Sequence, residues 1–369
     1  MALIAIAISF VVMISAVAIS SGFRHELRKG IAEISGDIQL TTADLNLINA
    51  DDPIHIRPSF LDSLQQFSSI REVQPVIYRP GIVKSGENIQ GILIKATDND
   101  MDSLCISVPA RLAKMLELEE GDKLLTYFVG EKTKARNFRV GEIYDGILAD
   151  EENLVVFARK EDLRRVNGWM QNECSAIELM APSERGDQKK LQNTTDAIAD
   201  MLVNSEGETS DLIAHSSRQR FPQLFAWMDL IDNNVLLVLV LMTIVAGFNM
   251  ISGLLIMLFR NVSTIGILKA MGMTDKAISM VFLKAASDMV LKGMLIGNVI
   301  ALSCCYLQGR FHLISLDPAN YFLSYVPVSL DLPVILLAEL LSYLVIMLLL
   351  LIPCLFVSRV DPARSVRMQ

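Results

Sequence analysis

The stretch "VLLVLVLMTIVAGFNMISGLLIMLFRNVSTIGILKAMGM", residues 235–273, joins a long apolar run to a short amphipathic segment. The run from Val235 to Phe259 contains no charged residue and is longer than the roughly 20 residues that a helix needs to cross a bilayer core. Arg260 ends this run, and apolar residues then recur at helical spacing up to Gly272. The stretch therefore predicts a membrane helix followed by a short helix outside the hydrocarbon.

Three other runs are long enough to cross a membrane. They lie at residues 2–21, 286–307 and 332–357. The first contains Ala16-Val17-Ala18, a pattern typical of signal-peptide cleavage sites, but its apolar stretch is longer than that of a usual signal peptide and lacks a basic segment before it. We therefore predict a retained helix here, and four membrane helices in total.

Charged residues are distributed unevenly along the chain. Residues 1–22 contain none, whereas Asp and Glu outnumber Lys and Arg between residues 23 and 230. The net charge of −8 at pH 7 argues against a nucleic-acid partner, because proteins that bind nucleic acid present a basic surface. An acidic block therefore lies between membrane segments.

Short loops rich in Lys and Arg face the cytoplasm in membrane proteins. Residues 260–277 and 359–369 each contain three such cations, whereas residues 308–332 contain only one. We therefore predict that the first two segments are cytoplasmic and that residues 23–230 are extracytoplasmic. The three cations directly after the first run disagree with this topology, but long translocated domains largely escape the rule.

The acidic block mixes strand-like and helix-like patterns. Apolar residues alternate with polar ones in the expected strands and recur every three or four positions in the expected helices. Strands are expected at 38–40, 73–85, 89–97, 123–130, 138–146, 153–159 and 175–182, and helices at 23–31, 62–69, 109–122, 161–168 and 189–204. This mixture predicts an α+β domain.

The predicted fold class is an α-helical membrane protein with four transmembrane helices and a large α+β domain inserted between helices 1 and 2. Its expected parts are the first membrane helix, 1–22; the α+β domain, 23–230; the later membrane helices, 231–259, 278–307 and 333–358; the cytoplasmic segment, 260–277; the outer loop, 308–332; and the cytoplasmic tail, 359–369.

The sequence contains no recognised catalytic pattern. Its four histidines lack the HxxxH, HExxH and CxxC neighbours that hold metal ions, and neither GxSxG nor the Walker A motif occurs. Without a phosphate-binding loop and its lysine, the chain has no evident way to hydrolyse ATP. We therefore predict no catalytic, cofactor-binding or metal-binding residues. Cys105 and Cys174 are expected to be either a disulfide or two buried thiols.

Lys284, Asp288 and Lys292 lie four residues apart in the third apolar run, so they share one side of a helix. A charge at the bilayer centre costs about 2.5–3.5 kcal/mol on insertion scales. Either this stripe lies near the cytoplasmic interface, where its side chains reach water, or it faces another helix and transmits movement; we favour the first. Gly293 and Gly297 are spaced for close helix packing.

The short segment after the second run also has a regular pattern. Val262, Ile265, Leu268 and Met271 recur every three positions and predict one apolar ridge, and Gly272 is suited to end the helix. Such a ridge fits a groove of a soluble partner. A helix that lies on the lipid surface has the same pattern.

Five stretches of the sequence resemble the FtsX/MacB-type permeases of ABC transporters, most closely the lipoprotein-releasing permeases. The third is the most specific, because it contains the second membrane helix and the family's cytoplasmic coupling helix. The fourth favours the lipoprotein-releasing branch over the macrolide-export and cell-division branches. The stretches are "GFRHELRKGIAEISGDIQL" (22–40), "PARLAKMLELEEGDKLLTY" (109–127), "VAGFNMISGLLIMLFRNVSTIGILKAMGM" (245–273), "LDPANYFLSYVPVSLD" (316–331) and "IPCLFVSRVDPARSVRM" (352–368).

The resemblance implies a complex of two permease subunits and two ABC ATPase subunits in the bacterial inner membrane, with the large domain in the periplasm. The permease is then not an enzyme, and ATP and Mg²⁺ are bound by the partner ATPase. In the outer loop, Tyr321 and Pro327 match the family's pattern. The residues implied to form the ATPase-coupling helix are Arg260, Val262, Ile265, Gly266, Leu268, Lys269, Met271 and Gly272.

This sequence departs from the family at three places. The family often has an acidic–basic pair where Arg260 and Asn261 stand, and a glutamate where Thr264 stands. The resemblance therefore implies the coupling helix itself but not the family's polar contacts with the ATPase. The periplasmic hook with which some relatives capture the carrier protein has no recognisable counterpart. The family's cytoplasmic segment before the first helix is also not present in this sequence.

The implied function is ATP-driven extraction of lipoproteins from the inner membrane and their transfer to a periplasmic carrier. A triacylated lipoprotein has about 40 methylenes, and at roughly 0.8 kcal/mol for each, their exposure to water costs about 30 kcal/mol. The almost uncharged first and second runs are suited to line an apolar path for these chains, to face membrane lipid, or both. The alternative function is MacB-type efflux or FtsX-type mechanical signalling to a periplasmic partner.

Overall fold

A computed structural model of the chain describes residues 2–42, 53–56, 58–98, 101–128, 133–146, 154–203, 211–317 and 323–354. Two compact units are present, which we call the helical unit and the α+β unit. The helical unit comprises Met1–Arg24, Ala226–Ser315 and Tyr325–Gln369, and the α+β unit comprises His25–Phe225 and Leu316–Ser324.

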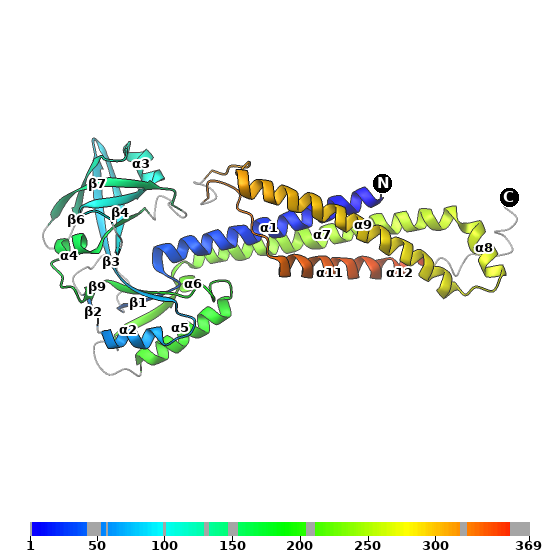
Figure 1. The fold of residues 1–369 in the computed structure, drawn as a ribbon, viewed down its shortest axis with the longest axis horizontal. Helices are drawn as coiled ribbons and strands as arrows, with labels where there is room; N and C mark the ends of the chain where they lie inside the picture. Colours follow the sequence, from blue (N-terminus) through cyan, green and yellow to red (C-terminus); the bar gives the residue numbers. More distant parts are fainter. Residues whose placement is uncertain are drawn as a thin grey trace. The chain divides into compact units, whose positions relative to one another are not determined.

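The helical unit contains four helices that are long and apolar enough to cross a membrane. They are α1 (Ala2–Ser35), α7 (Pro222–Arg260), α9 (Asp275–Phe311) and α11 (Leu332–Leu349), and α11 is followed by the short α12 (Leu351–Cys354) (Figure 1). Each of the four predicted runs contributes most of its residues to one of these helices. Another short helix, α8 (Val262–Ala270), lies between α7 and α9.

Two of these helices extend into the part of the chain that we had predicted to be the α+β domain. α1 continues beyond residue 22 because Phe23, Leu27 and Ile31 keep the apolar spacing of a helix and are buried. α7 begins before residue 231, at Pro222, a residue type that suits the first turn of a helix. The two boundaries that we predicted for the α+β domain, residues 23 and 230, therefore lie inside the helices α1 and α7.

α9 is also longer than its predicted bounds of 278–307. It begins directly after Thr274, whose Oγ1 accepts a hydrogen bond from the Ala277 N–H at 3.4 Å. It ends at Phe311, where His312 adopts the left-handed conformation with φ +48°. A side-chain cap and a left-handed residue therefore set the two ends of this helix.

α1 is the most enclosed of the four helices. In the most apolar 18 residues of α1, 50% of the segment is buried, whereas the corresponding share is 22–28% for the other three helices. Its residues Ile6 and Phe10 pack closely against two glycines of α9. A Cβ atom added at Gly297 would lie 2.8 Å from the Ala7 carbonyl oxygen, and one added at Gly293 would lie 2.8 Å from Ile6 Cγ2. The predicted small-residue spacing therefore serves the packing of α9 against α1.

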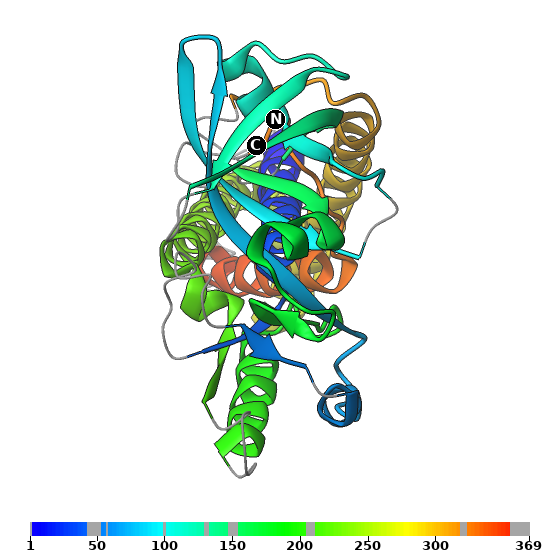
Figure 2. The same ribbon diagram turned by 90° about the vertical axis from the view of Figure 1, so that its left-hand side faces the viewer.

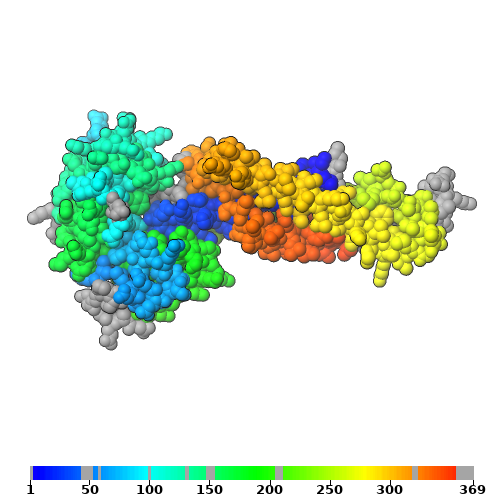
Figure 3. Space-filling view, in the orientation of Figure 1, coloured from blue at the N-terminus to red at the C-terminus, as the bar shows by residue number. Residues whose placement is uncertain are grey.

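Polar side chains connect α11 with its neighbours inside the helical unit. The hydroxyls of Thr243 on α7 and Ser342 on α11 lie 3.0 Å apart, and those of Ser287 on α9 and Tyr343 on α11 lie 2.8 Å apart. α9 and α11 run along the face of this unit that Figure 3 shows. Most side chains that point away from the unit along α7, α9 and α11 are apolar, as expected for helices in lipid.

In the described part of the chain, the α+β unit contains eleven strands and five short helices. The strands are β1 (Ile38–Thr42), β2 (Ile54–His55), β3 (Glu72–Ser85), β4 (Asn88–Thr97), β5 (Cys105–Pro109), β6 (Lys123–Phe128), β7 (Lys134–Tyr144), β8 (Val155–Arg159), β9 (Glu173–Cys174), β10 (Ala176–Met180) and β11 (Leu212–Ser216). The helices are α2 (Pro58–Gln65), α3 (Ala110–Leu116), α4 (Lys160–Asn167), α5 (Gln188–Val203) and α6 (Ser217–Arg220).

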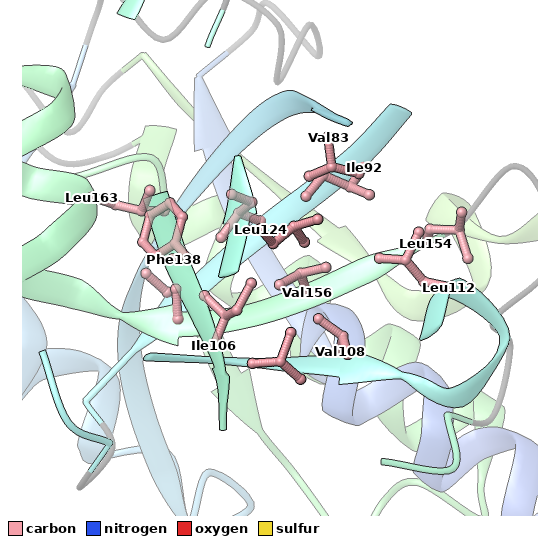
Figure 4. Packing of buried hydrophobic residues seen from close by; sticks show 14 of the residues in the cluster. Val83, Ile92, Ile106, Val108, Leu112, Leu124, Phe138, Leu154, Val156 and Leu163 are labelled. Atoms are coloured by element: carbon pink, nitrogen blue, oxygen red, sulfur yellow. The ribbon is translucent and has the colours of Figure 1, made fainter. Parts of the chain in front are cut away.

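The long strand β3 belongs to two lobes of this unit. Its second half pairs with β4 and β6, so that the order β3-β4-β8-β5-β7-β6 closes on itself as a barrel. β3 and β4 form a long hairpin (Figure 2). The barrel core is built from inward-facing aliphatic and aromatic side chains, including Ile106, Val156 and Phe138 (Figure 4). Each described strand of this lobe therefore has a pairing partner on both sides, as in a closed barrel.

The first half of β3 belongs to an open antiparallel sheet with the strand order β11-β1-β10-β3. Helices α2 and α5 contribute to the core beside this sheet, which includes Leu40, Ile177 and Ile198. β1 enters this sheet directly after α1, by a turn at Gly36 with φ +71°. The polypeptide therefore passes from the first long helix straight into the open sheet.

The sequence left open whether the two cysteines of the α+β unit form a disulfide, and in the structure they do not. Cys105 on β5 and Cys174 on β9 are both free thiols. Burial raises the pKa of the Cys174 thiol to about 12, so this side chain is a neutral apolar group at physiological pH. Within the described part of the chain, no three His, Cys, Asp or Glu residues are grouped so that they could hold a metal ion.

Candidate functional site

The short helix α8 is held between the ends of α7 and α9 by its own backbone. Asn261 interrupts the helix after α7, and its side-chain amide donates to the Met257 carbonyl at 2.8 Å. At the other end, the N–H groups of Gly272 and Met273 donate to the carbonyls of Lys269 and Leu268 at 2.9 and 3.0 Å. Gly272 has φ +89°, so a residue without a side chain allows this tight helix ending.

The apolar ridge predicted for this segment does not form one accessible surface. Ile265 is only 1% exposed and packs in the core of the helical unit, and Leu268 is partly buried against the same core. Met271 is 78% exposed and points away from it. The helix uses its most apolar side to pack on its own chain, so the prediction of a single partner-facing ridge was wrong in its geometry.

A different side of α8 is accessible, and we call it the open face. Ile267 is 52% exposed on this side, one turn before Met271. In a helix with 3.6 residues per turn, the exposed residues of this segment fall within about 120° of the helix circumference. The open face consists of Ser263, Thr264, Ile267, Ala270 and Met271.

The basic residues of this segment differ in their surroundings. Lys269 Nζ lies 2.8 Å from Asp275 Oδ1, and the lysine side chain is largely buried. This ion pair connects the end of α8 to the first turn of α9, where a carboxylate also complements the helix dipole. Arg260, in contrast, is exposed. Arg260 is therefore accessible to a partner, whereas Lys269 contributes to the shape of the segment.

The polar stripe on α9 faces away from the described helices of this chain. Lys284, Asp288 and Lys292 are all exposed, while Ala286 and Val290 on the opposite side are buried. Lys292 Nζ lies 2.6 Å from Asp288 Oδ2. The sequence left open whether the stripe faces another helix. In the described part of this chain, the three side chains of the stripe are exposed and do not pack against another helix.

The outer loop between α9 and α11 begins with a structured turn. The Gln308 side chain, which is buried, donates to the Val326 carbonyl at 3.1 Å and accepts from the Ile314 N–H at 3.0 Å. Pro327 lies against Gly22 of α1 so closely that any side chain at Gly22 would overlap the loop backbone. Tyr321, the second residue predicted for this loop, lies outside the described residues.

One of the basic residues that disagreed with the predicted topology has an acidic partner in the helical unit. Arg24 Nη1 lies 3.1 Å from Asp232 Oδ2, and the Ser20 hydroxyl donates to the same carboxylate at 2.9 Å. Next to them, the rings of Phe23 and Trp227 meet edge to face, with centroids 6.2 Å apart. These contacts join α1 to α7, and sequence spacing alone did not reveal them.

Residues 236–362 match the model of a family described as the FtsX-like permease C-terminal domain. This part of the chain is therefore similar to the C-terminal domain of FtsX-like permeases. The match begins within α7, at residue 236, and contains α8, α9 and α11 entirely. The open face of α8 therefore lies within the residues that match this family.

Two solved structures are similar to part of the chain. One is the extracellular domain of the noncanonical ABC-type transporter YknZ from Gram-positive bacteria, with 11% identity and a TM-score of 0.31, covering 48% of this chain and 99% of that domain. The other is the periplasmic region of MacB from Actinobacillus actinomycetemcomitans, with 11% identity and a TM-score of 0.33, covering 54% of this chain and 97% of that region. Similarity at this level does not establish a shared function. No curated protein matches the chain significantly.

Proposed function

We propose that this chain is the membrane-spanning permease subunit of an ABC transporter, and that it extracts lipoproteins from the bacterial inner membrane for a periplasmic carrier. A separate subunit would hydrolyse ATP, and a second permease, identical or homologous, would complete the complex. The observation that carries the proposal is the FtsX-like domain, with the short helix α8 held rigidly at the turn between two membrane helices. The sequence itself has no Walker A motif.

The open face of α8 is the proposed ATPase contact. Its exposed side chains Ile267 and Met271 provide the apolar anchors, and the exposed Arg260 is available for a polar contact at its edge. Ile265 and the Lys269–Asp275 ion pair fix α8 to α9. A partner that displaces α8 through its open face would therefore displace the membrane helices as well. Such a rigid connection suits the transmission of a rigid-body movement.

The accessible side of α7 supports a role in the movement of acyl chains. Over about three turns this side presents only large apolar side chains, which offer lipid-like surroundings to a chain leaving the bilayer. Its exposed residues in that region are Leu236, Leu237, Val240, Leu241, Ile244, Val245 and Phe248. Membrane lipid and the acyl chains of a lipoprotein are the two ligands that such a surface fits.

A photo-crosslinking residue at Val240 is expected to capture acylated lipoprotein in native membranes. Val240 is exposed on the apolar side of α7, so its side chain can be replaced without disturbing the core. The matched control is the same crosslinker at Leu337, an equally accessible residue of α11. Mass spectrometry of the adducts is the measurement. Adducts with phospholipid alone at both positions would contradict the lipoprotein role and favour efflux or mechanical signalling.

A further inference from the structure

The α+β unit contains a cluster of polar side chains that are almost completely buried. Lys95 on β4, Tyr78 on β3 and Glu178 on β10 come from three neighbouring strands and are at most 2% exposed. Lys95 Nζ donates to Glu178 Oε2 at 2.7 Å, and the Tyr78 hydroxyl hydrogen-bonds to the other oxygen of the same carboxylate. Gln39 of β1 donates to the Tyr78 hydroxyl oxygen at 3.2 Å.

This cluster also binds the last turn of α1. Lys95 Nζ donates to the carbonyl oxygens of Glu33 and Ile34 at 2.7 and 3.0 Å, and the Tyr78 hydroxyl lies 2.6 Å from the Ile34 carbonyl oxygen. The last carbonyls of a helix have no partner within the helix, and a cation there also complements the helix dipole. Two strands of the sheet therefore supply the donors that the end of α1 lacks.

The ionic groups in this cluster do more than stabilise the sheet. Burial lowers the pKa of Lys95 and raises that of Glu178, and in each case the charge of the other residue opposes the shift. A buried ion pair is often no more stabilising than well-packed apolar side chains of similar size. Apolar replacements, however, cannot bind the carbonyl oxygens of Glu33 and Ile34. What the lysine and its partners provide is a fixed position for the end of the helix.

We infer that Lys95, Glu178 and Tyr78 are positioning residues of a joint that fixes the last turn of α1 to the sheet of the α+β unit. Through this joint, a displacement of α1 moves strands β3, β4 and β10 together with it. The inference rests on the proposed function, in which ATP binding in a partner moves the membrane helices. It assigns the contact through which a movement along α1 reaches the strands of the α+β unit.

The double variant Lys95→Met with Glu178→Met tests the joint in the complete complex with its ATPase. It removes both charges at once, so neither remains buried and unpaired, and the fold is expected to be kept. Hydrogen exchange of the α+β unit is measured with and without ATP and vanadate. We expect the nucleotide-dependent change in exchange of β3, β4 and β10 to be lost, while ATPase binding stays as in the unmodified complex.

Two further variants keep the test independent of folding. Tyr78→Phe removes only the hydroxyl that reaches α1, and is expected to reduce the same response. Lys160→Met is the matched control, because Lys160 is an equally buried lysine that donates to a carboxylate. Its acceptor is Asp98, the residue after β4, and not the end of α1. It is expected to leave the response unchanged.

The outcomes separate the joint from the proposed function. Loss of the response in the double variant, with Lys160→Met responding normally, supports the joint. A full response in the double variant overturns the joint and leaves the proposed function standing. An unmodified complex that shows no response to nucleotide in the α+β unit overturns both the joint and the transmission of movement in the proposed function.

Discussion

Replacement of Ile267 and Met271 together by glutamate is expected to abolish binding of the ATPase subunit while the helical unit stays folded. Both side chains lie on the open face of α8 and are more than half exposed, so the change removes no core packing. Burial of a large apolar side chain contributes about 1.5–3 kcal/mol. Loss of two such contacts weakens binding by about 100-fold or more, since each 1.4 kcal/mol is about a factor of ten.

Co-purification of the ATPase with the tagged permease, followed by titration of the purified ATPase, measures this effect. Met170→Glu is the control, because Met170 is a similarly exposed methionine in the α+β unit. It is expected to leave ATPase binding unchanged. An unaltered dissociation constant for the Ile267→Glu, Met271→Glu variant would show that α8 is not the docking helix, and would favour a helix that lies on the lipid surface.

Gly297→Leu is expected to separate α1 from α9 and to unfold the helical unit. A Cβ atom at this position would lie 2.8 Å from both the Ala7 carbonyl oxygen and Phe10 Cβ. The backbone of α1 cannot rotate away as a flexible side chain can, so α1 itself must move. Excess volume in a packed core costs about 1–3 kcal/mol, and we expect about 3 kcal/mol or more here because α1 is the central helix.

Thermal unfolding in detergent, followed by size-exclusion chromatography, measures this loss. Gly309→Leu is the matched control on the same helix, because no heavy atom lies within 4 Å of a Cβ atom added at Gly309. It is expected to unfold at nearly the same temperature as the unmodified protein. Equal unfolding temperatures for the two variants would mean that the contact of α9 with α1 does not hold the helical unit together.

The membrane helices could be predicted from the sequence because their signal is local. A run such as Val235–Phe259 is long, apolar and uncharged, and few structures other than a membrane helix accommodate it. The strands β3, β4, β8 and β10 were also predicted close to their observed bounds, since alternation along a strand is a local property. The short strands β5 and β11 were not predicted.

The candidate site was predicted in its place but not in its orientation. Apolar spacing located α8, yet it could not show that Ile265 would pack on α7 and α9 and leave Ile267 accessible. That choice depends on neighbours far away in the sequence. The buried cluster was missed for the same reason: Lys95 stands in the apolar stretch "ILIKA", and only the fold brings Glu178 to it. A lysine within an apolar strand was the one available signal.

Purification of the full chain from native membranes, with identification of the proteins bound to it, tests the central claim most directly. Our account predicts that a soluble ATPase with a Walker A motif co-purifies in equal amount with the permease subunits, and that a lipoprotein is bound when hydrolysis is blocked. Recovery of the intact helical unit without any ATPase would contradict the claim that this chain is an ABC transporter permease.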